Sequence, residues 1–402
     1  MPTTIESALL AGANAHASQI SQWRRAIHEQ PELGFCEERT SKYIEEQLKS
    51  IGVKKITKAG GTGLVAEIGT STDKSVGLRA DMDALPIQET TNQSYSSKVQ
   101  GVMHACGHDA HVACVLGAAK LLVEQEKAGK LPGTVRLLFQ PAEETVNAEH
   151  KSGATLLIED GALKGMKALV ALHVFPAMPA GVVGIRSGPV LAACDSFEVT
   201  IQGKGCHGAQ PDVGVDAVVL SAQAVQALQT VVSRRIGANE IGLLTIGGIK
   251  SSSYAPNVVS DSVQMTGTVR YMETPMHDRF LSEINRALSV VNALGGSYTL
   301  DYHNETPVLN NDERVTAIVK EAIEAVIGTS AVVQFPQILG AEDFAFYTAH
   351  VPSCFFGLGV GIEGSARELH SPNFDINEKA LPLGSALLAQ SALTLLTKCD
   401  SI

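Results

Sequence analysis

The sequence predicts an α/β fold in which a mostly parallel central sheet is flanked by helices, with a smaller α+β domain inserted into it. Over the first 188 residues, short apolar segments alternate with helical patterns. Near Pro189 the strand-like segments change to alternating apolar and polar residues. After Pro307 the sequence returns to the first pattern, in which short apolar segments alternate with helical ones. We therefore expect a first domain in two parts, residues 1–188 and 303–402, and an inserted domain at residues 189–302.

The first domain is expected to begin with helices. Ile20, Trp23 and Ile27 recur at helical spacing, and Pro31 and Gly34 separate two helices within the first 50 residues. Short apolar runs bounded by Gly, Ser or Asp predict buried strands. The expected strands are residues 64–68, 76–82, 135–139 and 168–173, with helices at residues 111–126 and 312–327.

The inserted domain contains two passages in which a strand, a helix and a strand follow one another. This order is typical of an α+β sandwich. The expected strands are residues 196–203, 243–249 and 262–271, and the expected helices are residues 216–233 and 275–294.

The charge balance limits the classes of partner. The 402 residues include 31 Lys and Arg against 42 Asp and Glu, a net charge of −11, which disfavours binding to nucleic acid or anionic membranes. The most apolar stretch, residues 168–185, is interrupted by His173, Pro176 and Pro179, so we expect no membrane span. The N-terminus does not read as a signal peptide. Seven cysteines, an odd number, indicate free thiols and a cytoplasmic location.

Candidate metal ligands are densest at residues 103–111. Only Gly107 separates Cys106 from His108, and in an extended segment this spacing directs both side chains to the same side. We expect a helix to begin near Asp109, with that residue as its N-cap. The alternative interpretation is a loop thiol beside ordinary histidines.

Two pairs of carboxylates follow predicted strands. Asp81 and Asp83 end the strand at 76–82, where they would bind a metal, orient a metal-bound histidine or form a turn. Glu143 and Glu144 follow the strand at 135–139. Adjacent glutamates point in different directions, so one would bind metal and the other would act as general base. The alternative is a solvated first turn of a helix.

Two histidines complete the candidate set. His173 closes the strand at 168–173 and His370 lies near the C-terminus; alone, each would be an ordinary hydrogen-bonded histidine. In a parallel sheet the strand ends meet at one edge. Cys106, His108, His173, His370 and one of the two glutamates would then supply five ligands. Five ligands are too many for one tetrahedral ion and predict two divalent ions.

These segments occur in a fixed order together with further motifs. In that order they resemble the zinc-dependent amidohydrolase family that contains hippurate hydrolase, the aminoacylases, the indole-acetyl-amino-acid hydrolases and N-acetyl-diaminopimelate deacetylase. The resemblance runs essentially from end to end. Its motifs are residues 24–28, 31–33, 79–86, 104–109, 140–144, 340–344 and 370–375.

The resemblance implies a two-metal centre in the first domain. Glu143 would be the general base, and Asp83 would support a metal ligand. Mixed Cys, His and Glu ligation suits zinc, with manganese, cobalt or nickel as alternatives. By position in the family, the metal ligands would be Cys106, His108, Glu144, His173 and His370.

The resemblance also implies that the inserted domain forms a homodimer and reaches the active site. His207, in a glycine-rich segment, would stabilise the oxyanion, often in the active site of the partner subunit. Asn257 and Arg270 would hold the substrate carboxylate, for which a guanidinium group is well suited. For Arg270 the alternative is an ordinary surface charge on a strand.

Together these features predict an enzyme that hydrolyses the amide bond of N-acyl amino acids. The expected substrates are small molecules such as N-acetyl, N-benzoyl or other aryl-acyl conjugates, and the products are a carboxylate and a free amino acid. The alternatives are a dipeptidase or aminopeptidase of the same fold, and a non-catalytic relative that binds small ligands. The pair Glu143 and Glu144 speaks against a mere binder, which has no need for a base beside a metal.

Overall fold

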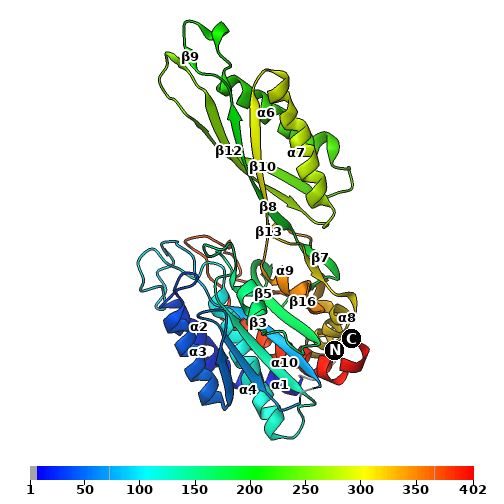
Figure 1. Cartoon of the computed structure of the whole chain (residues 1–402). Coiled ribbons are helices and arrows are strands. Elements are labelled where there is room, and N and C mark those ends of the chain that lie inside the picture. Colours follow the sequence, from blue (N-terminus) through cyan, green and yellow to red (C-terminus); the bar gives the residue numbers. More distant parts are fainter. Residues whose placement is uncertain (1–6, 72, 366) are drawn as a thin grey trace. The chain divides into compact units, whose positions relative to one another are not determined.

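The structure is a computed structural model that describes residues 7–71, 73–365 and 367–402. The chain divides into two compact units (Figure 1). Unit 1 comprises Met1–Val190, Asn310–Pro336 and Asp343–Ile402, and unit 2 comprises Leu191–Leu309 and Gln337–Glu342. Unit 2 is thus formed mainly by a segment that interrupts unit 1.

Unit 1 is built on an eight-stranded sheet with the order β1-β2-β4-β3-β5-β16-β6-β15. The central strands β4, β3, β5 and β16 run parallel, whereas β1 and β2 are added antiparallel at one side. This arrangement confirms the predicted α/β class with a mostly parallel sheet. The strands are β1 (Lys55–Lys58), β2 (Leu64–Ile68), β3 (Ser75–Asp81), β4 (Thr134–Gln140), β5 (Ala168–Pro179), β6 (Val183–Ile185), β15 (Val332–Gln334) and β16 (Ser353–Gly361).

The register of the parallel strands brings chemically active segments to one edge of the sheet. Asp81 at the end of β3 is opposite Gln140 at the end of β4, and His173 on β5 is opposite Gly357 on β16. The carboxyl ends of parallel strands are where α/β folds bind ligands.

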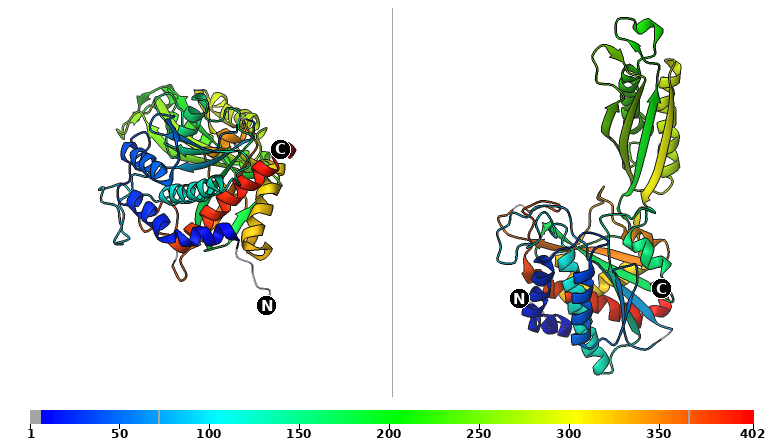
Figure 2. Two further views of the ribbon diagram at one scale, coloured as in Figure 1. Left: turned by 90° about the horizontal axis from the view of Figure 1, so that it is seen from below. Right: turned by 60° about the vertical axis from the view of Figure 1, so that its left-hand side comes forward.

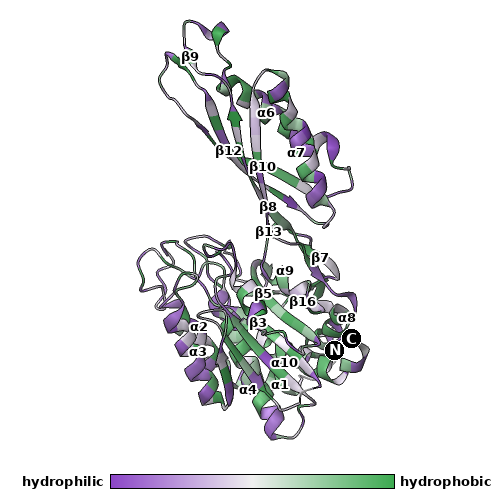
Figure 3. Cartoon of the chain, viewed as in Figure 1, coloured by the Kyte–Doolittle hydropathy of each residue, from purple (hydrophilic) through white to green (hydrophobic). Residues whose placement is uncertain are grey.

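Four helices of unit 1, α1, α2, α3 and α10, pack against α4, which is buried along most of its length because small and apolar residues occupy all its faces. Figure 2 shows α4 (cyan) beside α10 (red), and both also contact β3 and β5. In Figure 3 the strands of this sheet are mostly hydrophobic, whereas polar residues colour much of α2 and α3. The helices are α1 (Ala8–Ala15), α2 (Ala17–His28), α3 (Glu38–Ile51), α4 (His108–Lys127), α5 (Gly153–Glu159), α8 (Glu313–Ile327), α9 (Phe344–Thr348) and α10 (Leu381–Thr397).

By length and composition, one helix of the described chain, Glu378–Thr397, would be able to cross a membrane. Most of it is buried inside unit 1, where α10 packs against α4 and α8. Its apolar composition is that of a core helix.

Unit 2 contains a four-stranded antiparallel sheet with the order β10-β12-β8-β13, and α6 and α7 pack side by side on it (Figure 1). Burial alternates along β8, so that Phe197, Val199 and Ile201 point into the core beneath the helices. The elements are β8 (Ala193–Gln202), α6 (Ala217–Thr230), β10 (Gly242–Ser251), β12 (Ser262–Tyr271), α7 (Met276–Ala293) and β13 (Ser297–Thr306).

Two small sheets join distant segments of the chain. The strand β7 (Gly188–Leu191) pairs with β14 (Leu309–Asn311), where the chain enters and leaves unit 2. Within unit 2, β9 (Cys206–His207) pairs antiparallel with β11 (Val258–Val259).

One expected helix cap is wrong. The helix α4 begins at His108, its N-cap is Gly107 with φ of 93°, and Asp109 lies buried in the first turn. Asp109 cannot be the N-cap because it follows the first helical residue, and its Oδ2 atom accepts hydrogen bonds from Arg24 Nε and His28 Nδ1, each at 2.7 Å.

Candidate metal centre

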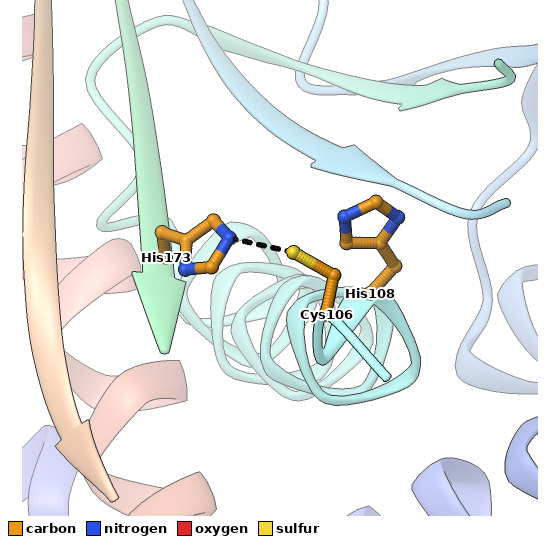
Figure 4. A group of neighbouring side chains, drawn as sticks. All are labelled: Cys106, His108 and His173. Carbon is orange, nitrogen blue, oxygen red and sulfur yellow. Dashed lines mark hydrogen bonds between the residues drawn. The ribbon is translucent and has the colours of Figure 1, made fainter. Parts of the chain in front are cut away.

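Three predicted ligands, Cys106, His108 and His173, lie together in unit 1 (Figure 4). His173 comes from β5, and the other two flank Gly107 at the start of α4. A Cβ atom at Gly107 would lie 2.3 Å from Val174 Cγ2, so glycine is required between the two ligands. The Cys106 Sγ atom lies 3.4 Å from His173 Nε2, and one ligand atom of each residue lies within 4.8 Å of the others.

Cys106 also belongs to a second group, with Glu144 and His370. The His370 Nε2 atom is 3.0 Å from Glu144 Oε1. The backbone N–H of His370 donates to Ala105 O at 2.8 Å, which ties the C-terminal loop to the cysteine segment. The structure therefore brings all five predicted ligands into one set, in which the Cys106 thiol is shared by both groups.

Asp83 orients two members of this set. His108 Nδ1 lies 2.9 Å from the Asp83 backbone oxygen and 3.2 Å from its Oδ1, so it donates its proton to Asp83. The other ring nitrogen, Nε2, is buried and makes no hydrogen bond to the described residues. Asp83 Oδ2 also accepts from the backbone N–H of Glu144 at 3.0 Å. A buried imidazole nitrogen without a hydrogen-bond partner, beside a thiol and a carboxylate, is a donor set that fits a divalent metal such as zinc.

Glu143 lies on a loop, since residues 141–152 contain no helix, and the first-turn interpretation of this pair is wrong. Its Oε1 atom accepts from the backbone N–H of Asp343 at 3.4 Å, and its Oε2 atom is 3.9 Å from His108 Nε2. The preceding residue, Ala142, has φ of 44°. A left-handed conformation costs an alanine about 1–2 kcal/mol, so neighbouring groups must hold the loop in place.

Burial and neighbouring charges set the protonation of the ligands. Burial lowers the pKa of His173 well below its usual value, which leaves its lone pair available. Burial also opposes ionisation of His108, but Asp81 and Asp83 outweigh it and raise the pKa of His108. Hydrogen bonds to Cys106 and Glu144 raise the pKa of His370 to about 10, and burial raises the pKa of the Cys106 thiol. A bound cation would displace these protons.

Asp81 does not have the same role as Asp83. It accepts from Arg79 Nη1 and from His111 Nδ1, each at 2.6 Å. Because His111 Nε2 accepts from the backbone N–H of Val174 at 3.0 Å, both ring nitrogens of His111 are already engaged. The chain from Arg79 to His111 therefore supports the strand that carries His173.

The roles of Arg79 and Arg24 were missed in the sequence. Arg79 is buried inside β3 and also binds Asp343 at 2.9 Å. Arg24 is buried on α2 and pairs with Asp109 at 2.7 Å. The sequence did contain a sign of these roles. Arg79 interrupts an apolar strand, and Arg24 lies next to Trp23 on the apolar stripe of its helix. Both positions are expected to be buried, and a buried arginine requires acidic partners.

The remaining candidates lie in unit 2. His207 is exposed on β9, and the backbone O of Asn257 accepts from the N–H of Gly208 at 2.8 Å, so the structure brings these two segments together. Arg270 lies near the other end of β12, opposite Cys194. It is eight residues from Ser262, where β12 begins, which is about 27 Å along an antiparallel strand. Within unit 2, Arg270 is therefore far from His207 and Asn257.

Comparison with known proteins relates this site to hydrolases. The sequence profile of peptidase family M20/M25/M40 matches residues 77–394. An N-acetyl-L-cysteine deacetylase of Bacillus subtilis is 40% identical over 383 residues, covering 94% of this chain and 88% of that protein. The IAA-amino acid hydrolase ILR1-like 2 of Arabidopsis thaliana is 37% identical over 389 residues, covering 94% and 86%.

A solved structure agrees with the sequence relatives. A dinuclear metal binding peptidase from the M20 family, from Bacillus subtilis, superposes with a TM-score of 0.83 at 32% identity. The alignment covers 96% of this chain and 99% of that one. The profile match spans well over half of the chain, and the relatives are named for hydrolysis of amide bonds. The chain is therefore a hydrolase of amide bonds and belongs to peptidase family M20/M25/M40.

Proposed function

We propose that this enzyme hydrolyses the amide bond of N-acyl amino acids and releases a carboxylate and a free amino acid. The observation that carries the proposal is the shared Cys106 thiol, which joins two groups of ligand atoms that do not include Glu143, although Glu143 also lies within reach of His108 and Glu144. The names of the relatives support an N-acetyl or aryl-acetyl substrate class. The seven cysteines are all free thiols, which favours a cytoplasmic enzyme.

Two divalent ions, zinc in our proposal with manganese, cobalt or nickel as alternatives, would supply Lewis-acid activation of a water molecule and of the acyl carbonyl. His108 and His173 would hold one ion and Glu144 and His370 the other, with Cys106 shared. Glu143 would accept a proton from the attacking water and return it to the departing nitrogen. Asp83 would keep His108 oriented through the bond to Nδ1.

His207 is suited to stabilise the oxyanion. Its Nδ1 atom accepts from the backbone N–H of Ala209 at 3.0 Å, so in the neutral imidazole the proton is on Nε2. The Nε2–H group on this exposed ring can donate a hydrogen bond to a developing negative charge.

We propose that the enzyme is a homodimer through unit 2. Asn257 and Arg270 lie near opposite ends of β12, so one small carboxylate can contact both only if they come from different subunits. We assign His207 and Asn257 to the active site of the partner subunit, because their segments are paired with each other.

A substrate panel tests the proposed function. The purified enzyme is assayed for release of free amine from N-acetyl, N-benzoyl and N-indoleacetyl amino acids and from dipeptides, with and without a chelator. We expect chelator-sensitive turnover of at least one N-acyl class. Preferred cleavage of dipeptides would favour the peptidase alternative, and metal uptake without turnover of any substrate would favour the non-catalytic binder.

A further inference from the structure

The loop that carries Glu143 is held against residues 33–37. A Cβ atom at Gly34 would lie 2.5 Å from Thr145 Cγ2 and 3.2 Å from Ala142 Cα. The two segments can approach this closely only because residue 34 is a glycine without a side chain. Ala142 is buried, and its left-handed backbone is unfavourable for an alanine. Such a conformation persists only where the surroundings enforce it.

The Glu37 carboxylate is the side-chain group that binds the backbone N–H of this strained residue, whose carbonyl oxygen accepts from the N–H of Gly153 at 3.0 Å. Glu37 is buried, and its Oε1 atom accepts from the backbone N–H of Ala142 at 2.8 Å. Its Oε2 atom accepts from Thr62 Oγ1 at 2.6 Å. Glu37 occupies the N-cap position of α3, yet its side chain makes no capping bond to that helix. The carboxylate is thus committed to the catalytic loop instead of its own helix.

We infer that Glu37 is a positioning residue that holds Ala142 in its left-handed conformation and thereby sets the place of Glu143. The inference rests on the proposed role of Glu143 as general base. Glu144 is held separately, because its backbone N–H donates to Asp83 Oδ2 at 3.0 Å. Loss of the Glu37 contact should therefore impair proton transfer by Glu143 more than metal binding by Glu144.

The test compares Glu37→Gln, which retains an acceptor oxygen for the Ala142 N–H, with Glu37→Met, which has similar length and none. We expect Glu37→Gln to keep kcat within about threefold of the natural enzyme, and Glu37→Met to lose about 10-fold to 100-fold in kcat with KM little changed. If the Met variant does not fold, Glu37→Asp replaces it, because its charge is retained but its reach is one methylene shorter. Natural kcat in a folded Met or Asp variant would overturn the inference.

A second substitution separates positioning from general loss of packing. Glycine adopts positive φ readily, so Ala142→Gly should raise the kcat of the Met or Asp variant about tenfold while giving no such gain in the natural chain. The control is Glu32→Ala, which removes a carboxylate that accepts from Thr40 N at 2.9 Å at the start of α3 without contacting Ala142. We expect this control to keep its kcat. Absence of rescue by glycine would assign Glu37 a merely structural role.

Hydrogen exchange gives a readout that does not depend on turnover. A peptide covering residues 141–146 should exchange faster in the Glu37→Met variant than in the natural chain or in Glu32→Ala. Unchanged exchange would contradict the proposed contact. If the natural enzyme cleaves none of the tested amides, the proposed function fails, and the exchange measurement still decides whether Glu37 holds the loop.

Discussion

At the scale of single residues, Glu143 is the proposed general base and lies outside the proposed set of metal ligands. The five candidate ligands form a set that does not require it, and its carboxylate is 3.9 Å from His108 Nε2. We expect Glu143→Gln to bind metal as the natural enzyme does while kcat falls about 100-fold to 10,000-fold, because the amide cannot accept the proton. Metal analysis of the purified variant alongside the substrate assay checks this. Normal turnover would remove Glu143 from its proposed role.

Asp83 should affect metal affinity, since it orients His108 and the backbone of Glu144. For Asp83→Ala we expect the affinity for zinc to fall about 10-fold to 100-fold. Competition with a chromophoric chelator measures this affinity. Asp160→Ala is the matched control, because the Asp160 carboxylate accepts from the backbone N–H of Gly60 instead. Equal affinities in the two variants would contradict the role of Asp83.

Glu89 should make the stability of the enzyme depend on pH. Burial opposes its ionisation, but hydrogen bonds from His28, Thr91 and the Ser97 N–H prevail and lower its pKa from 4.5 to about 2. Its folded pKa lies below the unfolded one, so the ionised group stabilises the fold above pH 4.5, and this contribution is lost as the pH falls towards 2. Urea unfolding over this range should show a loss about 1–2 kcal/mol larger in the natural chain than in Glu89→Gln. Parallel pH curves for the two chains would show that Glu89 contributes nothing.

Cys106, His108, Glu144 and His173 were candidates because each follows a predicted strand or lies at the start of a helix, and such positions converge in a parallel sheet. His370 lies in a loop nine residues after β16, so its position in the sequence gave no such reason. The supporting contacts were harder to foresee. Nothing in the order of residues shows that Glu37 turns away from its own helix to reach Ala142, because that contact spans more than 100 residues and depends on tertiary packing. The choice between Glu143 and Glu144 likewise came from the family resemblance.

At the scale of elements, the turn into α4 depends on Gly107. A side chain there would meet both a φ of 93° and a contact of 2.3 Å with Val174 Cγ2. We expect Gly107→Ala to lower the free energy of unfolding by about 2–4 kcal/mol. Gly165 is the matched control, because its φ is 75° and nothing lies within 4 Å of its added Cβ, so alanine should cost about 1 kcal/mol. Thermal unfolding of both variants checks the difference, and equal losses would show that the contact with Val174 is easily relieved.

Helices and strands whose apolar residues recur at one clear spacing were predicted from the sequence, and other elements were not. The strand expected at residues 64–68 is β2, and the helices expected at 275–294 and 312–327 are α7 and α8 within a residue or two. The strand β13 was missed, although exposed polar residues alternate with half-buried ones along most of it. The strand β16 was missed because a central strand that is buried on both faces shows no alternation of apolar and polar residues. The start of α4 agrees with the expected start within one residue, but its N-cap is Gly107, and Asp109 lies inside the first turn, where its Oδ2 atom accepts from Arg24 and His28.

At the scale of the whole molecule, the proposed dimer predicts complementation. If His207 acts in the site of the partner subunit, a chain with Glu143→Gln and a chain with His207→Ala can form one complete site between them. Each variant alone should be inactive, and a refolded equimolar mixture should recover about one quarter of the natural activity. Assays before and after mixing test this. Failure of mixed dimers to regain activity would place His207 within its own subunit or outside the reaction.

The pairing of β7 with β14 has a consequence for the history of such chains. The chain enters unit 2 at β7 and leaves it at β14, and these two strands are hydrogen-bonded to each other. The two ends of the inserted segment are therefore close together, and unit 1 does not have to change to accommodate a different insertion. A recombination event that replaced the segment between β7 and β14 would leave the candidate metal ligands of unit 1 in place. Such an exchange would replace His207, Asn257 and Arg270 together, so the groups proposed to contact the substrate would change while the candidate metal ligands stayed the same.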